Sequence, residues 1–407
     1  MILLFLDNLK YNFKCLIRNL FLLTHIPILL TERNYSRKIK SLKCKEKINI
    51  IFLVNNNTKW NGDSLYKKLD ANNYFYPVVL VIVPKNNDYI DNIHYQFFQK
   101  RGYRVFTVSC FNDIIKHKPD IIFFQEPWFT FKFKNNFSLL RLSKYSLCMY
   151  FHYSITPNIV FSEIWKKSKY FYKLLFKHFV YDQDCSNEFK YLGVNNTVIT
   201  GHPILDVYSE PVKKSIWRNP QKYKIIYAPH HSFSNNSLKW ATFEWNGKEI
   251  LKKAIDNPDT EWIFKPHPWF RNFIVKYGIM KKQEIDDYFN SWEQIGQVYL
   301  EGDYFDIFRT SDLLITDCGG FLTQYLPTKN PVIHLISSNG EKRSSIGDKS
   351  SQNYYKANNM NELNNIFDML VNKKEDPLKE KRLLDASKIL LNSSDNIINE
   401  LQKEIKP

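Results

Sequence analysis

Three residue types that shape many folds are scarce or dispersed in this chain of 407 residues. Only 12 Gly and 17 Pro occur, which excludes a collagen-like or Pro/Gly-rich low-complexity protein. The six Cys stand far apart with no C-x-x-C pair, and we interpret them as buried, reduced thiols. Because such thiols are typical of a reducing compartment, we expect a cytosolic chain.

Long uninterrupted apolar runs are also missing. The leucine-rich start of the chain is broken by Asp7, Lys10, Lys14 and Arg18, so it lacks the roughly 20 apolar residues that cross a bilayer. It also lacks the cationic start and small-residue cleavage site of a signal peptide. Its apolar residues recur at helical spacing with Lys10, Lys14 and Arg18 on the flank, which is typical of a helix lying on a membrane surface. The alternative is an amphipathic helix packed on the protein's own core.

Acidic residues are in the minority, with 41 Asp and Glu against 57 Lys and Arg and a formal charge of +16. Residues 1–48 alone hold ten basic and three acidic side chains. This balance predicts an anionic partner, which could be nucleic acid, an anionic lipid surface or a phosphate-bearing substrate. No nucleic-acid recognition motif is present, so we expect no nucleic-acid partner.

Apolar residues make up 44% of the chain, which excludes intrinsic disorder, and after residue 48 they form short runs. The runs are continuous rather than alternating and are rich in β-branched and aromatic residues. Continuous apolarity predicts strands buried on both faces, as in a parallel sheet covered by helices. The runs of the first half are 48–54, 76–84, 103–109, 119–127, 145–155, 178–184 and 196–203.

A second series of runs follows a polar, proline-containing segment that we interpret as a linker. Its runs are 224–232, 260–268, 296–302, 311–320 and 330–337. The predicted fold class is α/β, with two Rossmann-like domains facing a cleft and an N-terminal amphipathic helix. The predicted divisions are a basic segment at 1–47, a first domain at 48–208, the linker at 209–223, a second domain at 224–375 and closing helices at 376–407.

Ligands of open α/β sheets bind beyond the carboxyl ends of the strands, so the residues after the runs are candidates for function. His152 follows a first-half run and could act as a general base, with a structural histidine as the alternative. Pro229, His230 and His231 follow the first run of the second half. Adjacent side chains on an extended segment point in opposite directions, so we expect at most one of these histidines to face a site. No third ligand lies at a recognisable spacing, and we predict no metal site.

Two further clusters in the second half suit a phosphate. In FKPHP, Lys265 can supply positive charge and His267 can supply hydrogen bonds. In SDLLITDCGGFL, a buried strand runs into Asp317 and the pair Gly319-Gly320 before a helix-like segment. Backbone N–H groups at such a turn face an anion, and glycine lets the main chain approach it closely. The turn lacks G-x-G-x-x-G and the Walker lysine, so it is neither a dinucleotide fingerprint nor a P-loop.

The motifs VITGHPILD, YAPHHSF, FKPHP, SDLLITDCGGFL and NPVIHL occur in this order, and together they resemble the CDP-glycerol:poly(glycerophosphate) glycerophosphotransferase family of teichoic acid and capsule polymer enzymes. The resemblance covers 145–340 and is strongest from 196 to 335. It implies a glycosyltransferase B fold with an N-terminal acceptor domain and a C-terminal nucleotide-donor domain. It further implies transfer of glycerol or ribitol phosphate from a CDP-linked donor to a polymer or lipid-linked acceptor, with release of CMP and with no metal or other cofactor.

The resemblance also implies roles for single residues. His152 looks like the base that deprotonates the acceptor hydroxyl, and His267 looks like a second essential histidine beside the donor diphosphate. The donor phosphates are assigned to Lys265, Thr316, Asp317, Gly319 and Gly320, and the nucleotide to Pro229, His231 and Gln324.

The chain departs from the family pattern at three places. Gly319 and Gly320 replace the serines of T-D-x-S-S, Gln324 stands where an acidic residue is common, and Tyr153 replaces the glycine of an H-G-T-P stretch. A nucleotide-sugar glycosyltransferase of the same fold, acting in capsule or lipopolysaccharide synthesis, therefore stays open. So does a noncatalytic, membrane-peripheral binding or scaffold protein.

The resemblance implies attachment to the inner face of the plasma membrane. A basic and aromatic stretch at 161–178, which includes Lys166 and Lys173, suits an anionic headgroup layer. We therefore expect a cytoplasmic protein, peripheral on the membrane, whose contacts include Lys10, Lys14, Arg18, Lys166 and Lys173.

Overall fold

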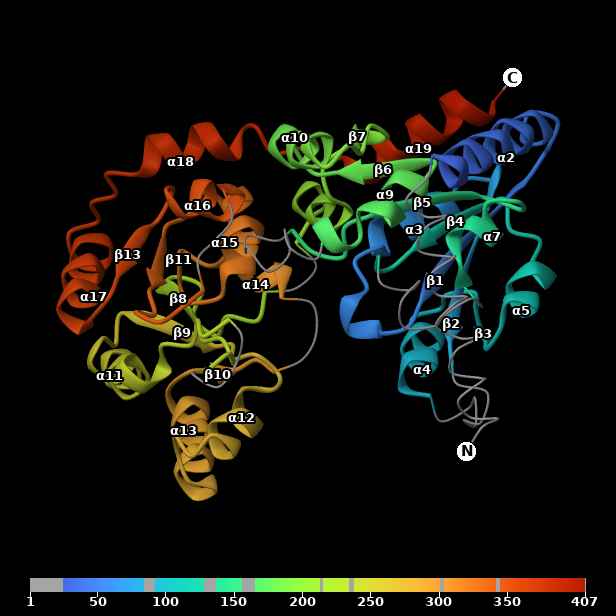
Figure 1. Cartoon of the computed structure of the whole chain (residues 1–407). Coiled ribbons are helices and arrows are strands. Elements are labelled where there is room, and N and C mark those ends of the chain that lie inside the picture. Colours follow the sequence, from blue (N-terminus) through green and yellow to red (C-terminus); the bar gives the residue numbers. More distant parts are fainter. Residues whose placement is uncertain are drawn as a thin grey trace, which may run out of the picture. The chain divides into compact units, whose positions relative to one another are not determined.

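The computed structural model describes residues 25–83, 92–127, 137–155, 165–212, 215–233, 238–300, 304–341 and 345–406. The chain divides into two compact α/β units (Figure 1). Unit 1 consists of Met1–Ser154, Ile164–Asp206 and Asn392–Pro407, and unit 2 of Ile155–Glu163 and Val207–Leu391, each within its described residues.

Unit 1 is built on a parallel sheet of seven strands in the order β3-β2-β1-β4-β5-β6-β7. These are β1 (Ile48–Val54), β2 (Phe75–Ile82), β3 (Val105–Val108), β4 (Ile121–Phe124), β5 (Leu147–Phe151), β6 (Lys177–Val180) and β7 (Thr197–Ile199). Every residue of β4 and β5 is buried, which explains their continuous apolar sequences. Strand order reverses at β1, which pairs with β2 on one side and β4 on the other.

Most helices of unit 1 lie between consecutive strands in the sequence, whereas the first precedes β1 and the last follows unit 2. They are α2 (Ile26–Leu42), η1 (Asn57–Lys59), α3 (Asp63–Asp70), α4 (Ile93–Lys100), α5 (Phe111–Lys116), α7 (Leu139–Leu142), α9 (Lys169–Leu174), α10 (Gln183–Tyr191) and α19 (Ser393–Ile405), with η3 (Pro203–Ser209) at the boundary of the unit. Short polar side chains start several of them. The Asn92 side chain accepts from the first turn of α4, and the Asp182 side chain does so for α10.

Unit 2 repeats the plan with a parallel sheet of six strands in the order β10-β9-β8-β11-β12-β13. The strands are β8 (Tyr223–Ala228), β9 (Thr260–Phe264), β10 (Gln297–Val298), β11 (Leu313–Thr316), β12 (Val332–Leu335) and β13 (Tyr355–Ala357). The helices are α11 (Phe243–Asp256), α12 (Phe270–Lys276), α13 (Lys282–Ile295), α14 (Phe305–Thr310), α15 (Gly319–Tyr325), η4 (Leu326–Thr328), α16 (Ser345–Ser351), α17 (Met360–Phe367), η5 (Asp368–Asn372) and α18 (Lys379–Ala386). The strand order is that of a Rossmann sheet, with its reversal between β8 and β11.

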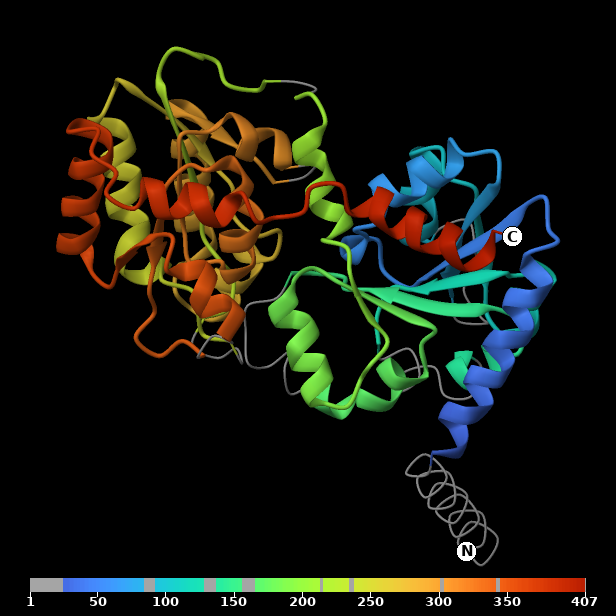
Figure 2. The same cartoon turned by 90° about the horizontal axis from the view of Figure 1, so that it is seen from above.

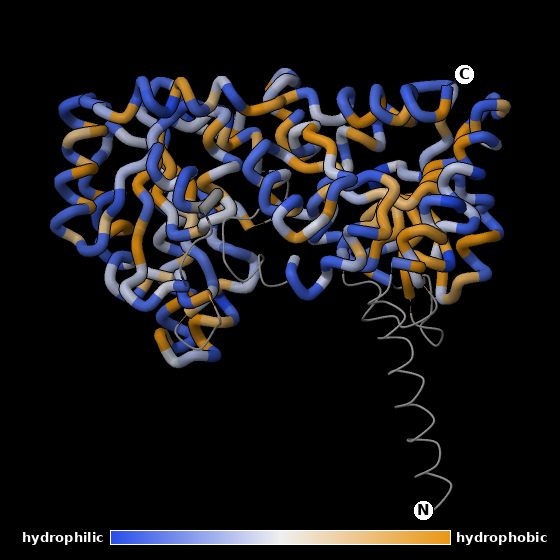
Figure 3. Tube along the Cα trace, turned by 45° about the horizontal axis from the view of Figure 1, so that its top comes forward, coloured by the Kyte–Doolittle hydropathy of each residue, from blue (hydrophilic) through white to orange (hydrophobic). Residues whose placement is uncertain are grey.

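The apolar strands form the centre of each unit, where Figure 3 shows hydrophobic segments surrounded by more polar helices. In unit 2, Trp262, Phe264 and Trp292 form part of a buried aromatic core. The helix α19 belongs to unit 1, although α18 before it belongs to unit 2 (Figure 2). The first turn of α19 is anchored by Asp206, whose carboxylate accepts from the backbone N–H groups of Ser393 and Ser394 at 2.7 and 2.8 Å.

The predicted fold class, with two parallel-sheet Rossmann-like domains, is confirmed. Each predicted run contains a strand in full or all but its first residue, while β13 is an additional strand that was not predicted from the sequence. The five described cysteines are free thiols, but Cys44 is exposed, so the expectation of uniformly buried thiols is wrong there. Among the described helices, none combines the length and apolar composition that a bilayer crossing requires.

Candidate functional site

The carboxyl ends of three neighbouring strands of unit 2 gather most of the predicted site residues. The sheet places β9, β8 and β11 side by side, with β8 pairing to both of the others. Pro229 and His230 follow β8, Lys265 follows β9, and Asp317 follows β11. The structure thus brings together residues from clusters that are nearly 90 positions apart, as a Rossmann sheet with this strand order requires.

Asp317 holds the loop after β8 in place. Its fully buried carboxylate accepts hydrogen bonds from the backbone N–H of His230 at 2.6 Å and from the backbone N–H and hydroxyl of Thr242 at 2.7 and 2.9 Å. Burial raises the pKa of Asp317 to about 6, although the donated hydrogen bonds favour the charged form. A carboxylate with these contacts positions backbone around the site, and a negative charge here does not attract phosphate directly.

Lys265 is a buried cation without a carboxylate partner among the described residues. Its side chain is 7% exposed, and its Nζ lies 4.7 Å from the ring centre of Tyr304 and 5.2 Å from that of Phe321. Burial lowers the pKa of Lys265 to about 8, because desolvation disfavours the ammonium form. A positive charge held over two aromatic faces at a sheet edge is suited to bind an anion.

His231 and His267 form a stacked pair at the same edge. Their ring centroids lie 3.7 Å apart with an interplanar angle of 27°. The Nδ1 of His267 accepts a hydrogen bond from the backbone N–H of Trp269 at 3.1 Å, so in the neutral ring the proton is on Nε2. Burial lowers the pKa of His267 to about 3 and that of His231 to about 4, so both rings are neutral at physiological pH. His267 can therefore donate a hydrogen bond from Nε2.

The expectation that His230 and His231 point in opposite directions is wrong. Their ring centroids are 4.4 Å apart, because both residues lie beyond the end of β8 and not on the extended strand that the expectation assumed. The Nδ1 of His230 lies 2.7 Å from the hydroxyl of Ser232 and also accepts from the Ser232 backbone N–H at 3.2 Å. His230 is buried, whereas His231 is half-buried.

The turn after β11 is ordered by Thr316. Its hydroxyl donates to the carbonyl of Ala228 at 2.6 Å and accepts from the backbone N–H of Cys318 at 3.0 Å, which fixes the start of α15. Gly319 is buried, whereas a Cβ added at Gly320 would meet no atom within 4 Å. A serine would therefore fit at Gly320, so packing does not explain why this residue is glycine.

Gln324 joins the same cluster through Tyr304. Its Oε1 accepts a hydrogen bond from the Tyr304 hydroxyl at 2.7 Å, and the Tyr304 ring lies beneath the ammonium of Lys265. Gln324 is thus buried and bonded within unit 2. Its assignment to the nucleotide stays a prediction.

His152, the predicted base, lies in the interior of unit 1. It follows β5 and is 2% exposed, and its Nε2 lies 2.9 Å from the Nε2 of His178. The backbone carbonyl of His152 accepts from the Nε2 of His202 at 2.6 Å. Burial, together with the two neighbouring histidines, holds the pKa of His152 well below its usual range. These contacts favour the structural alternative, and the role as base stays a prediction.

The predicted membrane contacts are described only in part. Lys10, Lys14 and Arg18 lie outside the described residues. Lys166 is exposed, and Lys173 is half-buried, with its Nζ close to Gly193. Neither observation tests contact with a membrane.

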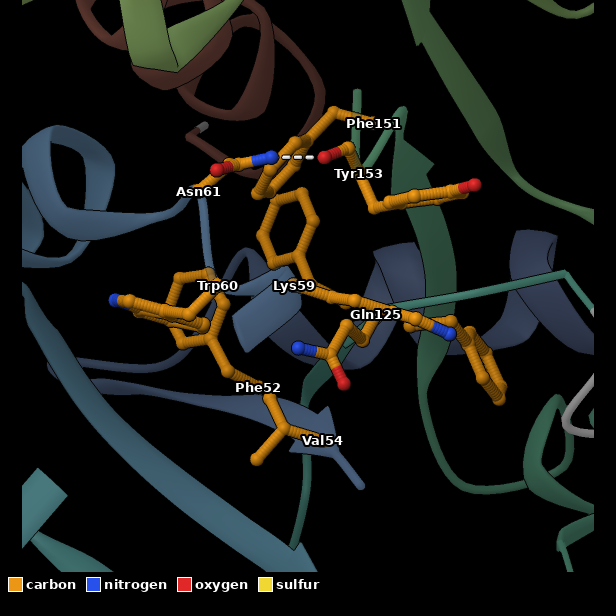
Figure 4. Close-up of a pocket in the computed structure, with 10 residues that line it drawn as sticks. Phe52, Val54, Lys59, Trp60, Asn61, Gln125, Phe151 and Tyr153 are labelled. Carbon is orange, nitrogen blue, oxygen red and sulfur yellow. Dashed lines mark hydrogen bonds between the residues drawn. The ribbon is translucent and has the colours of Figure 1, made fainter. Parts of the chain in front are cut away.

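The sequence reading missed a pocket at the corresponding edge of unit 1 (Figure 4). It lies at the carboxyl ends of β1, β4 and β5, and Lys59 and Tyr153 are among its lining residues. Lys59 forms an ion pair with the carboxylate of Glu126, which is not among the lining residues. The available signal was the acid of the QEP segment, which comes two residues after β4, much as Asp317 comes directly after β11 in unit 2. Within the described residues, no group of three or more His, Cys, Asp and Glu side chains could hold a metal ion.

The comparisons with known proteins show the fold. No protein-family model matches the chain, and no curated protein matches its sequence. Among solved structures, it is similar to UDP-GlcNAc 2-epimerase from Neisseria meningitidis bound to UDP-GlcNAc, with a TM-score of 0.60 and 13% identity over 88% of this chain and 100% of that one. It is also similar to a glycosyltransferase from Rickettsia africae, with a TM-score of 0.52 and 13% identity over 89% and 99%. Anabaena Alr3699/HepE in complex with UDP gives a TM-score of 0.53 and 11% identity over 88% and 100%. The chain therefore has two Rossmann-like units of the glycosyltransferase B type.

Proposed function

We propose that this protein is a transferase that uses a nucleotide-activated donor. In the specific form of the proposal, it moves glycerol or ribitol phosphate from a CDP-linked donor to a growing cell-surface polymer of the teichoic acid or capsular class, and CMP is released. The observation that carries the proposal is the buried ammonium of Lys265, which has no carboxylate partner among the described residues and lies near enough to His267 for its charge to lower the pKa of that imidazole. Both residues follow β9, next to β8 in the sheet of unit 2. The sequence motifs of the glycerophosphotransferase family supply the choice of donor.

The geometry suits a diphosphate. In transfer of a phosphoryl group, negative charge develops on the oxygens around the reacting phosphorus and on the leaving nucleotide. A fixed ammonium and a neutral imidazole that donates from Nε2 stabilise that charge without having to reorganise during the reaction. Asp317 and Thr316 hold the loops after β8 and β11 that surround this edge, so they act as positioning residues.

A nucleotide-sugar glycosyltransferase is the second candidate. It is supported by the fold, since the similar structures include a glycosyltransferase and proteins bound to UDP or UDP-GlcNAc. The same edge of unit 2 would then bind the diphosphate of a UDP-sugar, because its polar groups recognise phosphate and not the group that is transferred.

A donor screen with detection of released nucleotide separates these candidates. We expect release of CMP from CDP-glycerol or CDP-ribitol in the presence of a polyol-phosphate acceptor, and a loss of about a hundredfold in His267→Ala. The exposed His25 offers a matched control, and His25→Ala should retain full activity. Release of UDP from a UDP-sugar would select the glycosyltransferase, and conversion of UDP-GlcNAc without release would select an epimerase. No turnover of any donor would leave the scaffold alternative.

We also propose that the protein acts at the cytoplasmic face of the plasma membrane as a peripheral protein. One feature of the described residues supports this proposal. At the start of α2, Ile26, Leu29 and Leu30 are 49%, 61% and 41% exposed. Three apolar side chains within two turns, followed by the basic side chains of the same helix, suit a headgroup layer.

A further inference from the structure

Three histidines of the described chain share one local arrangement. In each of them, the Nδ1 of the ring accepts a hydrogen bond from the backbone N–H two residues further along the chain. The pairs are Ile204 and His202 at 3.2 Å, Ser232 and His230 at 3.2 Å, and Trp269 and His267 at 3.1 Å. A ring nitrogen that accepts a hydrogen bond carries no proton, so each neutral ring carries its proton on Nε2. The arrangement therefore fixes an N–H donor that points away from the bonded backbone.

In unit 1, this donor is used inside the protein. The Nε2 of His202 donates to the backbone carbonyl oxygen of His152 at 2.6 Å, and both residues are buried. Such a contact is required there, because a buried N–H group without an acceptor costs free energy. His202 thus shows what a histidine in this arrangement does when an acceptor oxygen is within reach.

In unit 2, the same donor finds no acceptor among the described residues. The bonds of His230 and His267 are made by their Nδ1 atoms, and neither Nε2 has a partner there. His230 is nevertheless only 8% exposed, and His267 is half-buried. Neither Nε2 is among the sealed and unpartnered atoms of the described chain, whereas the Nδ1 of His231 is. Both donors can therefore be reached from outside unit 2, and their acceptor has to come from solvent or from a ligand.

The ring of His230 is held in place by further hydrogen bonds. The Oγ of the fully buried Ser232 accepts from the backbone N–H of Trp240 at 3.1 Å, so its own proton is free to point at the Nδ1 of His230, which lies 2.7 Å away. The backbone N–H of His230 donates to the carboxylate of Asp317 at 2.6 Å. Burial and two neighbouring histidines hold the pKa of His230 well below its usual range, so the ring stays neutral. Ser232 and Asp317 are therefore positioning residues for His230.

His230 and His267 lie at the same carboxyl edge of the sheet. Pro229 and His230 follow β8, while Lys265 and His267 follow β9, and the two strands are paired. The backbone N–H of His267 donates to the carbonyl of Pro229 at 3.3 Å, and the ring centroids of His230 and His267 are 5.8 Å apart. The two imidazoles and the ammonium of Lys265 all present donors, so an anion rich in oxygen atoms suits them and a hydroxyl donor does not.

We propose that His230 is a further phosphate-binding residue, whose Nε2–H donates to the diphosphate of the nucleotide-activated substrate together with the Nε2–H of His267. The inference rests on the proposed function, because the diphosphate belongs to the substrate that this function requires. It holds equally for a CDP-linked substrate and for a UDP-sugar. The two neutral rings add hydrogen bonds without adding charge, so Lys265 is the only cation of the three side chains. An ordered water on each Nε2 is the alternative.

The position of the proton on His230 is measured by NMR on the full chain with ¹⁵N-labelled histidine. The two nitrogens of a neutral imidazole give separate signals, and Ser232→Ala, which removes a hydroxyl from the Nδ1 side of the ring, assigns those of His230. We expect the proton on Nε2 at neutral pH, and we expect saturating CDP to shift this Nε2 signal in the wild type. A proton on Nδ1 in the free protein, or an Nε2 signal that CDP leaves unchanged, would overturn the inference.

Two substitutions at the same position separate the two ring nitrogens. The amide nitrogen of glutamine can occupy the place of Nε2, whereas that of asparagine reaches only the place of Nδ1. We expect His230→Asn to weaken CDP binding at least about tenfold and His230→Gln to leave it within about threefold, since only asparagine loses the hydrogen bond to a charged group. Cytidine lacks the diphosphate, so it should bind both variants equally. If His230→Asn does not fold, the response of the wild-type Nε2 signal decides.

The outcomes distinguish this inference from the proposed function. Equal affinity of the two variants for CDP would overturn the inference alone, because the wild type would still bind a nucleoside diphosphate. A wild type that binds neither CDP, UDP nor inorganic pyrophosphate would overturn both. Binding that depends on His230 as expected, without turnover of any substrate in the donor screen, would support the inference and contradict the proposed function.

Discussion

The Nε2 atoms of His152 and His178 lie 2.9 Å apart inside unit 1. Since neither ring is exposed to water, one of these nitrogens must donate and the other accept. Protonation of both rings would place two cations in contact. Burial lowers the pKa of His178 to about 3. It also lowers the pKa of His202, whose Nε2 donates to the backbone carbonyl of His152, to about 4.

This cluster predicts that the protein loses stability in mild acid. A histidine that is neutral when folded and protonates near pH 6.5 when unfolded gives the unfolded state more bound protons below that pH, so the free energy of unfolding falls as the pH is lowered. His178 alone should contribute about 2 kcal/mol of loss between pH 7 and pH 5. Asp317 acts in the opposite sense between about pH 6 and pH 4, because its folded pKa is raised.

Urea unfolding of the wild type, His178→Phe and His25→Ala at pH 7 and pH 5 measures this effect. The loss should be smaller by about 2 kcal/mol in His178→Phe and unchanged in His25→Ala. An equal pH dependence in all three proteins would show that His178 protonates freely in the folded state.

Lys265 predicts a pH dependence of nucleotide binding. Its ammonium form predominates below its pKa of about 8, so affinity for CDP should be about tenfold lower at pH 9 than at pH 7. Lys265→Arg keeps its charge at pH 9 and should show no such decrease, whereas Lys265→Met should bind weakly at both values. Titration calorimetry with CDP measures all three, and a wild-type affinity that is constant from pH 7 to pH 9 would contradict the assignment.

The hydrogen bonds of Asp317 predict that its replacement lowers the stability of the protein and does not remove a group that recognises the ligand's charge. Asp317→Asn places an amide group against the donors of His230 and Thr242, so the free energy of unfolding should fall by about 3 kcal/mol. Asp312, at the other end of β11, is a matched control. Its side chain is 39% exposed and accepts from the backbone N–H of Lys224, so Asp312→Asn should lower the free energy of unfolding by only about 1 kcal/mol. Chemical denaturation compares the two, and equal losses would argue against the ordering role of Asp317.

The start of α2 predicts binding to lipid. Replacement of Ile26, Leu29 and Leu30 by serine should lower the affinity for anionic liposomes by at least about tenfold, measured by sedimentation, because up to about 2 kcal/mol is available from each large apolar side chain that leaves water. Ile93 is 68% exposed on α4, and Ile93→Ser controls for a general change in surface apolarity. Unchanged sedimentation of the triple variant would remove this surface from the membrane proposal.

The strands were predictable because burial on both faces leaves a strong signal. Sequences such as IIFF in β4 and LLIT in β11 are apolar at every position, which a two-faced core requires. β13 was not predicted because it has only three residues, one of them exposed, and lies at the edge of its sheet. Its place in the sheet comes from pairing with β12, which is a tertiary contact that no local pattern encodes.

The candidate site was predictable to a smaller extent. The order of the motifs identified Lys265, His267 and Asp317, and the sheet brings the strands before them together. What the sequence could not show is which polar groups are already used inside the protein. His152 and Glu126 both follow first-sheet strands, yet the Nε2 of His152 lies against another imidazole while one oxygen of Glu126 has no partner among the described residues.

The placement of α19 has a consequence for how the chain is made. Leu401 and Ile405 are buried in unit 1, and the carboxylate of Asp206 anchors the first turn of the helix. The larger segment of unit 2, Val207–Leu391, lies between Asp206 and Ser393 in the sequence. During synthesis, some 190 residues after Asp206 must therefore be made before the helix that covers part of the first sheet is available. A nascent chain that stops within unit 2 would expose apolar surface on an otherwise finished domain, and would be a ready substrate for a chaperone or a protease.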